Sequence, residues 1–413
     1  MNVIEKIMAA HSGKESVEPG DMVDVSLDYV MANDVTTTLA IDVFKNELKE
    51  TNVFDPKKLV VIMDHYTPSS SVAAADTHNK MREFCSEQGI ENVHDGQGVC
   101  HQIMMEGYVC PGQVVIGADS HTCTYGALGA LSTGMGSTDI AVGWADGKIW
   151  MKVPKAIKVT ASGKWPKNVS AKDLILKFIG DITAQGATYQ AVVFTGEAIE
   201  TLSISQRATL CNMGIECGAK FAYIPPDEKT DEYMKQQGRE EYIKYYDDED
   251  AVYEKTFQYD VSSLVPHIAA PHFVDNVDNI AKFVGMKINQ CFIGACTNGR
   301  YEDIEMAANV LKGKKIAKNV RLLITPASQE IYIKAANNGL LQALMEAGAM
   351  ISNPGCSACF GGSVGIVGKD EVLLTTANRN FRGRVGSPDA KIYIASPAVV
   401  VASALAGAVA MPE

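Results

Sequence analysis

The most distinctive chemistry in the sequence lies in ISNPGCSACFGGSVG at residues 351–365, where Cys356 and Cys359 stand two residues apart. This C-x-x-C spacing occurs in redox disulfides, zinc sites and iron–sulfur sites, so the spacing alone does not decide between them. A structural zinc site needs four protein ligands, but the sequence has no second C-x-x-C and no histidine after His272. Glycines flank both cysteines, which favours close approach of backbone N–H groups to an anion such as inorganic sulfide.

Cys296 is the third cysteine that we group with this pair. It lies at the end of the apolar stretch INQCFIGACTNG (288–299), where Thr and Asn follow the thiol. Three thiolates on a four-iron cluster leave one iron without a protein sulfur, and that iron can act as a Lewis acid. The other seven cysteines are predicted to be small buried core residues: Cys85, Cys100, Cys110, Cys123, Cys211, Cys217 and Cys291.

Polar clusters follow four of the five β-branched apolar runs that are typical of buried strands. The five runs lie at 58–65, 112–121, 288–299, 319–328 and 371–380. The clusters are Asp64-His65, Asp119-Ser120-His121, Cys296-Thr297-Asn298 and Asn378-Arg379-Asn380. Ligand sites of open α/β sheets form beyond the carboxyl ends of the strands, so the four clusters predict one composite site.

Helical patterns alternate with these runs, at 72–88, 301–312 and 329–347. This alternation predicts α/β layers with parallel strands. A chain of 413 residues is too long for one ordinary core. Its length predicts two or three domains, and the different character of the middle segment places loose boundaries near 155 and 285, which gives domains at 1–155, 156–284 and 285–413.

Two segments have a different character. The charged, tyrosine-rich stretch at 225–255 is predicted to form a solvated helix and loops. The Ala- and Val-rich run at 395–412 is near the minimum length of a membrane span, but it contains Pro397 and few large apolar residues. It is predicted to be a buried helix that starts just after the Ser396-Pro397 pair.

The net charge and the first residues of the chain narrow the expected binding partners and cellular compartment. The net charge of −12 argues against a nucleic-acid or anionic-membrane partner, so an acidic substrate must meet a local basic cluster. The opening sequence MNVIEKIMAAHSGKESVEPGD lacks the continuous apolar core of a signal peptide. We expect a cytoplasmic protein, in which the ten cysteines stay reduced.

Motifs along nearly the whole chain resemble those of the aconitase superfamily, in the family's order. The closest similarity is to the large subunits of its two-subunit hydro-lyases, the group that includes 3-isopropylmalate dehydratase and homoaconitase. The motifs are MDHYTP (63–68), GVCHQIMMEGYVCPG (98–112), GADSHTCTYGALGALSTGMGSTD (117–139), CNMGIECGAK (211–220), GACTNGRYEDIE (294–305), GCSAC (355–359), NRNFRGR (378–384) and ASP (395–397).

The resemblance implies a [4Fe–4S] cluster held by Cys296, Cys356 and Cys359, with one iron not ligated by cysteine. It also implies three α/β domains around a cleft that holds the cluster. The reaction implied is elimination of water from a hydroxy-di- or tricarboxylate, followed by re-addition of the hydroxyl to the neighbouring carbon. Hydroxide is a poor leaving group, so this chemistry needs a Lewis acid, a proton donor and a base.

The resemblance also assigns side chains to these tasks. The residues that match positions around the leaving hydroxyl are Asp64, His65, His101, Asp119 and His121. Those that match substrate binders are Ser120, Arg379 and Arg384, and a guanidinium has the planar fork that suits a carboxylate. Asn298 and Asn378 are candidate hydrogen-bond donors to cluster or substrate. Arg382 and the remaining histidines are expected to be structural or surface residues: His11, His78, His94, His267 and His272.

Two departures from the family pattern stand out. Many relatives carry a glutamate near the open iron in a segment before CNM, but Val193 occupies that position here and Glu197 fits only the pattern's second glutamate. That role is left unassigned. The family's swivelling fourth domain, which brings the proton-abstracting serine, has no counterpart in these 413 residues. The resemblance therefore implies a small subunit as partner.

The resemblance implies a large catalytic subunit of the 3-isopropylmalate dehydratase type, which acts in leucine biosynthesis. A homoaconitase or another dehydratase of substituted malates, such as 2,3-dimethylmalate, is the alternative. A cluster-free RNA-binding relative and a plain redox protein are more distant hypotheses. The acidic charge argues against the first, and the second leaves Cys296, the histidines and the arginine pair unexplained.

Overall fold

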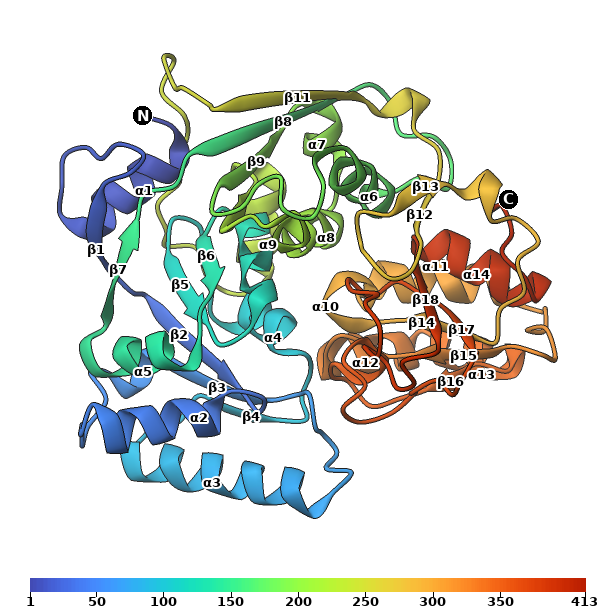
Figure 1. Ribbon diagram of the computed structural model, residues 1–413, viewed down its shortest axis with the longest axis horizontal. Helices are drawn as coiled ribbons and strands as arrows, with labels where there is room; N and C mark the ends of the chain where they lie inside the picture. Colours follow the sequence, from blue (N-terminus) through green and yellow to red (C-terminus); the bar gives the residue numbers. More distant parts are fainter. The chain divides into compact units, whose positions relative to one another are not determined.

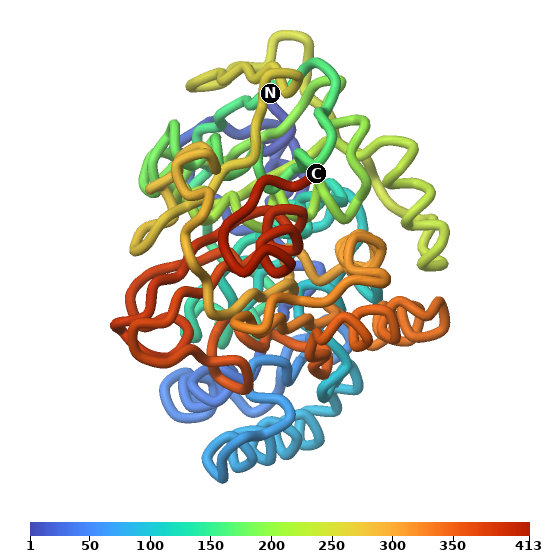
Figure 2. The backbone as a smooth tube through the Cα atoms, turned by 90° about the vertical axis from the view of Figure 1, so that its right-hand side faces the viewer, coloured from blue at the N-terminus to red at the C-terminus, as the bar shows by residue number.

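The computed structural model describes residues 1–413 (Figures 1 and 2), and the chain divides into two compact units. Unit 1 consists of Met1–Asp95, Ile103–Ser162 and Ala187–Tyr259. Unit 2 consists of Gly96–Gln102, Gly163–Gly186 and Asp260–Glu413. The strands of the three large sheets come from residues 29–134, 156–260 and 267–394. The division into three domains stays a prediction.

A five-stranded parallel sheet forms the centre of unit 1. Its strands, in spatial order, are β4 (Val93–Asp95), β3 (Leu59–Met63), β2 (Tyr29–Asn33), β5 (Val114–Gly117) and β6 (Leu131–Gly134). Every residue of β3 and β5 is buried, as expected for parallel strands covered on both faces. Because β2 lies between β3 and β5, the residues that follow these three strands lie beside one another.

Unit 1 also holds a two-stranded and a four-stranded sheet. The former pairs β1 (Met22–Ser26) with β7 (Lys148–Lys152), and the latter has the order β10 (Phe221–Tyr223), β9 (Ala191–Thr195), β8 (Ala156–Ser162) and β11 (Lys255–Asp260). The helices are α1 (Val3–Ser12), α2 (Thr37–Asp42), α3 (Val72–Gln88), α5 (Ser137–Asp146), α7 (Glu197–Thr201), α8 (Ile204–Met213) and α9 (Glu228–Gln236). Helix α4 (Cys100–Gly107) starts within the short segment Gly96–Gln102 of unit 2.

A seven-stranded sheet organises unit 2. Its order is β13 (Val277–Asn279), β12 (His267–Ala269), β18 (Lys391–Ile394), β17 (Val372–Thr375), β14 (Gln290–Ile293), β15 (Arg321–Ile324) and β16 (Met350–Ile351). The five strands from β18 to β16 run parallel. The helices are α6 (Ala171–Ile182), α10 (Ala295–Asn298), α11 (Tyr301–Leu311), α12 (Gln329–Asn337), α13 (Leu340–Ala347) and α14 (Pro397–Ala406).

The structure confirms the predicted strands and most of the predicted helices. All five apolar runs contain a strand (β3, β5, β14, β15 and β17), and α3 spans the predicted range 72–88. The helix predicted over 329–347 is two helices, because Gly339 adopts a left-handed conformation (φ 71°) that separates α12 from α13. The run at 395–412 forms α14, which starts at Pro397 and has a largely buried surface.

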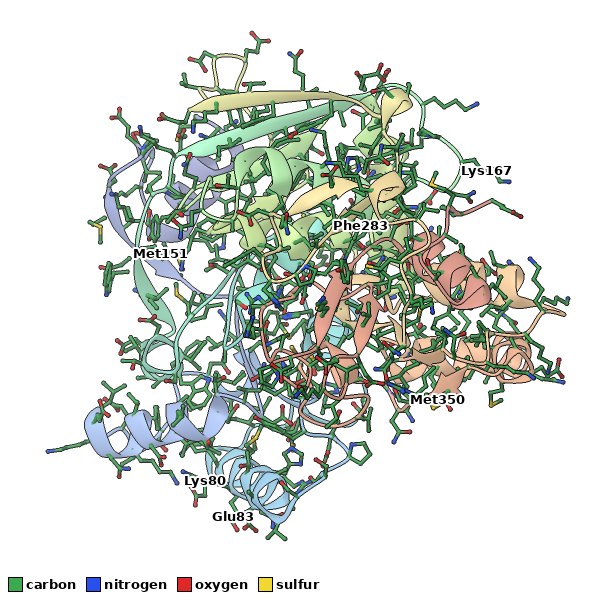
Figure 3. The ribbon with its side chains drawn as sticks, turned by 45° about the vertical axis from the view of Figure 1, so that its right-hand side comes forward. Lys80, Glu83, Met151, Lys167, Phe283 and Met350 are labelled. Carbon is green, nitrogen blue, oxygen red and sulfur yellow. The ribbon has the colours of Figure 1, made fainter.

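Helix α3 shows how sequence periodicity positions a side chain. Its buried residues are Ala74, His78, Met81, Phe84 and Cys85, at the spacing of one helix face. Figure 3 labels two other residues of this helix, of which Glu83 is exposed and Lys80 pairs with Asp42 at the end of α2. His78 therefore points toward the sheet. No helix of the chain combines the length and apolar character that crossing a lipid bilayer requires.

Candidate active site

The ends of β2, β3 and β5 bring together a connected set of histidines and carboxylates in unit 1. We call it the histidine–carboxylate chain, and its members are His78, Asp34, Asp64, His65, Asp119, His121 and Glu216. The predicted pairs Asp64-His65 and Asp119-His121 both belong to it. Asp34 follows β2, the strand between β3 and β5, so the order of strands in the sheet explains the assembly.

Asp34 is the most heavily bonded member of the histidine–carboxylate chain. Its side chain is 0 % exposed, and its carboxylate accepts hydrogen bonds from the backbone N–H groups of His65 (3.0 Å) and Tyr66 (2.9 Å). His78 Nε2 lies 2.9 Å from the same carboxylate. Burial by itself would raise the pKa of Asp34, but the hydrogen bonds from His65 and His78 hold it well below its usual value of 3.8. Asp34 is therefore a buried, ionised anchor for the start of the β3–α3 loop.

His65 connects Asp34 to the other members of the histidine–carboxylate chain. Its Nδ1 lies 2.7 Å from Asp64 Oδ1 and 3.6 Å from Asp34 Oδ1. On the other side of the ring, Nε2 lies 3.5 Å from Asp119 Oδ2. Carboxylates on both ring nitrogens fix the orientation of the imidazole and favour its protonated form. His65 is placed to hold a proton.

His121 continues the chain from Asp119 to Glu216. Asp119 Oδ1 accepts the backbone N–H of His121 (2.8 Å) and lies 3.3 Å from its Nδ1. His121 Nε2 lies 2.7 Å from Glu216 Oε1, and both side chains are largely buried. Glu216 lies in the 3-10 helix Gly214–Cys217 that follows α8. A second imidazole is thus held between two carboxylates.

The sequence analysis did not predict the roles of three members of the histidine–carboxylate chain. Asp34 and Glu216 were not named, although Asn33-Asp34 follows an apolar strand just as Asp64-His65 does. Glu216 lies inside the quoted motif CNMGIECGAK, but its pairing with His121 is a tertiary contact that the motif does not reveal. Val193 is a fully buried residue of β9. His78, expected to be structural, is bonded to Asp34.

The predicted cysteines lie in unit 2. Cys296 follows β14, Cys356 and Cys359 follow β16, and Asn378 follows β17. We use the name cysteine site for Cys296, Cys356, Cys359 and Asn378. The three thiols are all buried. Cys359 Sγ donates to Asn378 Oδ1 (3.2 Å), and Asn378 Nδ2 lies 3.6 Å from Cys296 Sγ. One amide side chain therefore joins cysteines that lie far apart in the sequence.

The backbone around the thiols has two non-glycine residues with positive φ angles, and arginine side chains donate hydrogen bonds to it. Ala295 and Ser357, each next to a cysteine, have positive φ angles of 63° and 50°. Two arginines hold the cysteine carbonyls in place. Arg300 Nη2 donates to the carbonyl oxygen of Cys296 (2.6 Å), and Arg384 Nε donates to that of Cys359 (2.9 Å).

This donor set fits a thiolate-bound anionic group. Soft sulfur ligands select iron–sulfur clusters or similar metals. The groups beside the thiols are amides and guanidinium groups, which stabilise negative charge. The residues present therefore match what an iron–sulfur cluster with three cysteine ligands requires.

The remaining predicted residues fall in both units. His101 is buried in α4 beside Gln102, whose side chain accepts a hydrogen bond from Arg300 Nε (3.0 Å) in unit 2. Arg379 is partly buried, whereas Arg382 is exposed, in agreement with its expected surface position. Ser120 is partly buried at the start of the 3-10 helix after β5.

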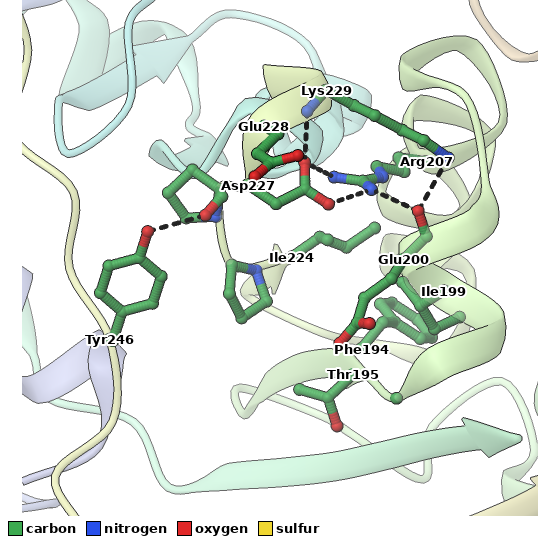
Figure 4. Close-up of a pocket in the computed structure, with 13 residues that line it drawn as sticks. Phe194, Thr195, Ile199, Glu200, Arg207, Ile224, Asp227, Glu228, Lys229 and Tyr246 are labelled. Carbon is green, nitrogen blue, oxygen red and sulfur yellow. Dashed lines mark hydrogen bonds and ion pairs between the residues drawn. The ribbon is translucent and has the colours of Figure 1, made fainter. Parts of the chain in front are cut away.

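A pocket of about 610 Å³ in unit 1 lies apart from these residues (Figure 4). Arg207 forms a two-pronged ion pair with Asp227 there and donates to the carbonyl oxygen of Glu200. Lys229 also donates to that oxygen and to the carbonyls of the next two residues. None of the predicted site residues lines the pocket. The ion pair and the lysine hydrogen bonds hold the loop between β10 and the start of α9.

The sequence model described as "Aconitase family (aconitate hydratase)" matches residues 5–407. The chain belongs to the aconitase family. This confirms the resemblance on which the sequence analysis relied, and the family implies a [4Fe–4S] cluster. The cysteine site brings three buried cysteines together.

Similar members of the aconitase family match this chain over its full length. It is 49% identical to "3-isopropylmalate dehydratase large subunit 1" of Pyrococcus furiosus (100% of this chain, 98% of that protein). Identity is 47% to the "Probable 3-isopropylmalate dehydratase large subunit" of Methanothermobacter thermautotrophicus (100% and 99%). The "Probable methanogen homoaconitase large subunit" of the same organism is 43% identical (100% and 98%).

A solved structure of the same fold is the holo form of Thermococcus kodakaraensis aconitase X. It superposes with a TM-score of 0.53 at 13% identity, covering 89% of this chain and 88% of that one. The similarity shows that the two chains share the aconitase fold. It confirms the predicted α/β fold class.

Proposed function

We propose that this chain is the large subunit of a 3-isopropylmalate dehydratase, a hydro-lyase that interconverts 2- and 3-isopropylmalate in leucine biosynthesis. The observation that carries the proposal is the histidine–carboxylate chain of unit 1 together with the cysteine site of unit 2 in one member of the aconitase family. Full-length relatives at 45–49% identity that bear this name support it.

We assign the three thiolates Cys296, Cys356 and Cys359 to a [4Fe–4S] cluster with one iron free of cysteine. When bound, such a cluster supplies a Lewis acid that polarises the substrate hydroxyl. Asn378 orients two of the sulfurs. Arg300 and Arg384 fix the cysteine carbonyls.

His65 and His121 hold the protons of the reaction. Each ring lies between two carboxylates, which stabilise its charged form and lower the cost of keeping a proton in a buried site. We assign to them the delivery of a proton to the leaving hydroxyl, with His101 as a further donor. Asp64, Asp119 and Glu216 orient the rings.

Arg379, Arg384 and Ser120 are the proposed binders of the substrate carboxylates. Arg384 donates to the carbonyl of Cys359 through Nε. Its two terminal nitrogens form a planar pair of donors, which suits the two oxygens of a carboxylate. Both arginines are partly accessible at the ends of unit 2 strands and loops. They form the local basic cluster that an acidic protein needs for an acidic substrate.

A small subunit is the proposed partner, because the relatives are named as large subunits. We assign the complex to the cytoplasm. The sequence carries ten cysteines, and a reducing compartment keeps cysteines as thiols.

Homoaconitase activity is the second candidate, because one full-length relative at 43% identity carries that name. The two activities differ in the substrate side group.

The test is a substrate panel. The large subunit is loaded anaerobically with iron and sulfide, mixed with its small subunit, and assayed by proton NMR on 2-isopropylmalate, 3-isopropylmalate, 2,3-dimethylmalate and homoaconitate. We expect interconversion of the isopropylmalates only when both subunits are present. Preference for homoaconitate supports the second candidate, and turnover by the large subunit alone would contradict the need for a partner.

A further inference from the structure

Lys172, the second residue of helix α6, has a fully buried ammonium group in unit 2. Its Nζ donates to the carbonyl oxygens of Thr376 (2.6 Å) and Ala377 (2.8 Å). These two residues directly precede Asn378, the amide that joins Cys359 and Cys296. The sequence analysis gave this lysine no role.

A buried ammonium group needs a compensating negative charge, because transfer of an unpaired charge out of water is costly. Its two hydrogen-bond acceptors are neutral carbonyls. The adjacent carboxylate of Asp173 is occupied by the backbone N–H groups of Ser170 and His267. Asp303 in turn accepts from Asn298 and from the backbone N–H of Arg300.

Asp303 and Asp173 contribute negative charge near Lys172, and the thiols of the cysteine site contribute more. Burial lowers the pKa of Lys172 to about 7, and the negative charges of Cys359 and Cys296 are the strongest influences that oppose this lowering. Stabilisation of this kind is mutual. The ammonium group favours the thiolate forms as much as they favour it.

We propose that Lys172 is the internal counter-charge of the cluster held by Cys296, Cys356 and Cys359, and that it raises the reduction potential of this cluster. The inference rests on the proposed function, because it needs the cluster. Lys172 acts here as a positioning and charge-balancing residue. Its two hydrogen bonds also fix the turn that presents Asn378.

The expected shift in midpoint potential follows from the change in cluster charge when one electron is added. Uptake of one electron from a chemical reductant adds one negative charge to the cluster. A fixed positive charge nearby stabilises that reduced state more than the oxidised state, and the effect is large where water is excluded. Removing the charge should therefore make the midpoint potential more negative.

The experiment uses the cluster-loaded large subunit and three variants. Lys172→Gln keeps an amide donor but removes the charge, and Lys172→Arg keeps the charge. Lys177→Gln is the matched control, because Lys177 lies on the same helix but is half-exposed and paired with Asp181. The midpoint potential is measured by anaerobic titration, followed by electron paramagnetic resonance of the reduced cluster.

We expect a shift to more negative potential in Lys172→Gln, and none in Lys177→Gln or Lys172→Arg. A Lys172→Gln protein with the wild-type potential would overturn the proposal. If Lys172→Arg assembles a cluster and a folded Lys172→Gln does not, the charge itself is required and the proposal stands. If neither Lys172 variant folds, or both fold without a cluster, the residue is a structural clamp and the proposal fails. A wild-type protein that never takes up a cluster instead refutes the proposed function.

Discussion

The histidine–carboxylate chain of unit 1 and the cysteine site of unit 2 both lie at the carboxyl ends of neighbouring parallel strands, yet they are held differently. In unit 1 the side chains position one another: each of the rings of His65 and His121 lies between carboxylates. In unit 2 the functional side chains are positioned through the backbone, because Arg300, Arg384 and Lys172 all donate to carbonyl oxygens.

This difference matches the chemistry that we propose for each region. Proton transfer needs imidazole rings with a defined orientation and charge, and a carboxylate partner supplies both. A cluster needs thiolates at fixed separations in surroundings that tolerate negative charge, so carboxylates next to the sulfurs would be harmful. Substitutions in the two regions should therefore have different consequences.

The largest effect is expected from Cys296→Ser. A serine hydroxyl is a poor ligand for iron, so we expect loss of the cluster and of all measurable dehydratase activity. Iron and sulfide per chain, together with turnover in the presence of the small subunit, measure the result. Cys291→Ser is the control, because Cys291 is a buried cysteine of β14 whose thiol donates to the carbonyl oxygen of Val400, outside the cysteine site. Full cluster content in Cys296→Ser would remove this residue from the ligand set.

The next largest effect is expected from His121→Gln. Loss of a positioned proton donor lowers turnover about 10²–10⁴-fold, whereas the cluster content should stay at the wild-type level. The matched control is His94→Gln, because His94 pairs with Tyr108 and is not a member of the histidine–carboxylate chain. Loss of the cluster in His121→Gln would show that the two regions depend on each other, contrary to the comparison drawn here.

A smaller effect, on stability, is expected from Asp34→Asn. Removal of the ionised acceptor should lower the free energy of unfolding by about 1–3 kcal/mol at neutral pH. Because the folded-state pKa of Asp34 lies below its usual value of 3.8, its stabilising effect is complete above that value and is lost as the pH falls below it. The difference between wild type and variant should thus shrink in acid.

Urea unfolding over a range of pH measures this difference. Asp42→Asn is the control, since Asp42 forms an exposed pair with Lys80, and its replacement should change stability by about 0.5 kcal/mol or less. A gap between wild type and Asp34→Asn that widens in acid would contradict the assignment of Asp34 as an ionised anchor.

The sequence predicted the strands well, because buried parallel strands are continuous apolar runs and their ends carry polar clusters. It predicted Cys296, Cys356 and Cys359 as one group from thiol chemistry and the family resemblance. It did not predict Asp34, because the order of strands in the sheet, with β2 between β3 and β5, is not visible along the chain.

The sequence analysis did not predict the roles of Lys172 and Glu216, for related reasons. A lysine in a helix that also holds Lys177 is expected to be solvated, and only the packing of α6 beside residues 376–377 shows that one of the two is buried. Glu216 is far from Asp119 and His121 in sequence, so its pairing with His121 follows from the contact between the 3-10 helices after β5 and α8. Local patterns report periodicity and composition, whereas such partners are set by tertiary contacts.

The amide of Asn378 also couples two loops that each carry a cysteine. It accepts a hydrogen bond from Cys359 and donates one toward Cys296, so a displacement of either loop strains a hydrogen bond to the other. A substitution of Asn378 should therefore disturb both thiols at once, whereas a substitution of either cysteine leaves the amide with one of its two sulfur partners.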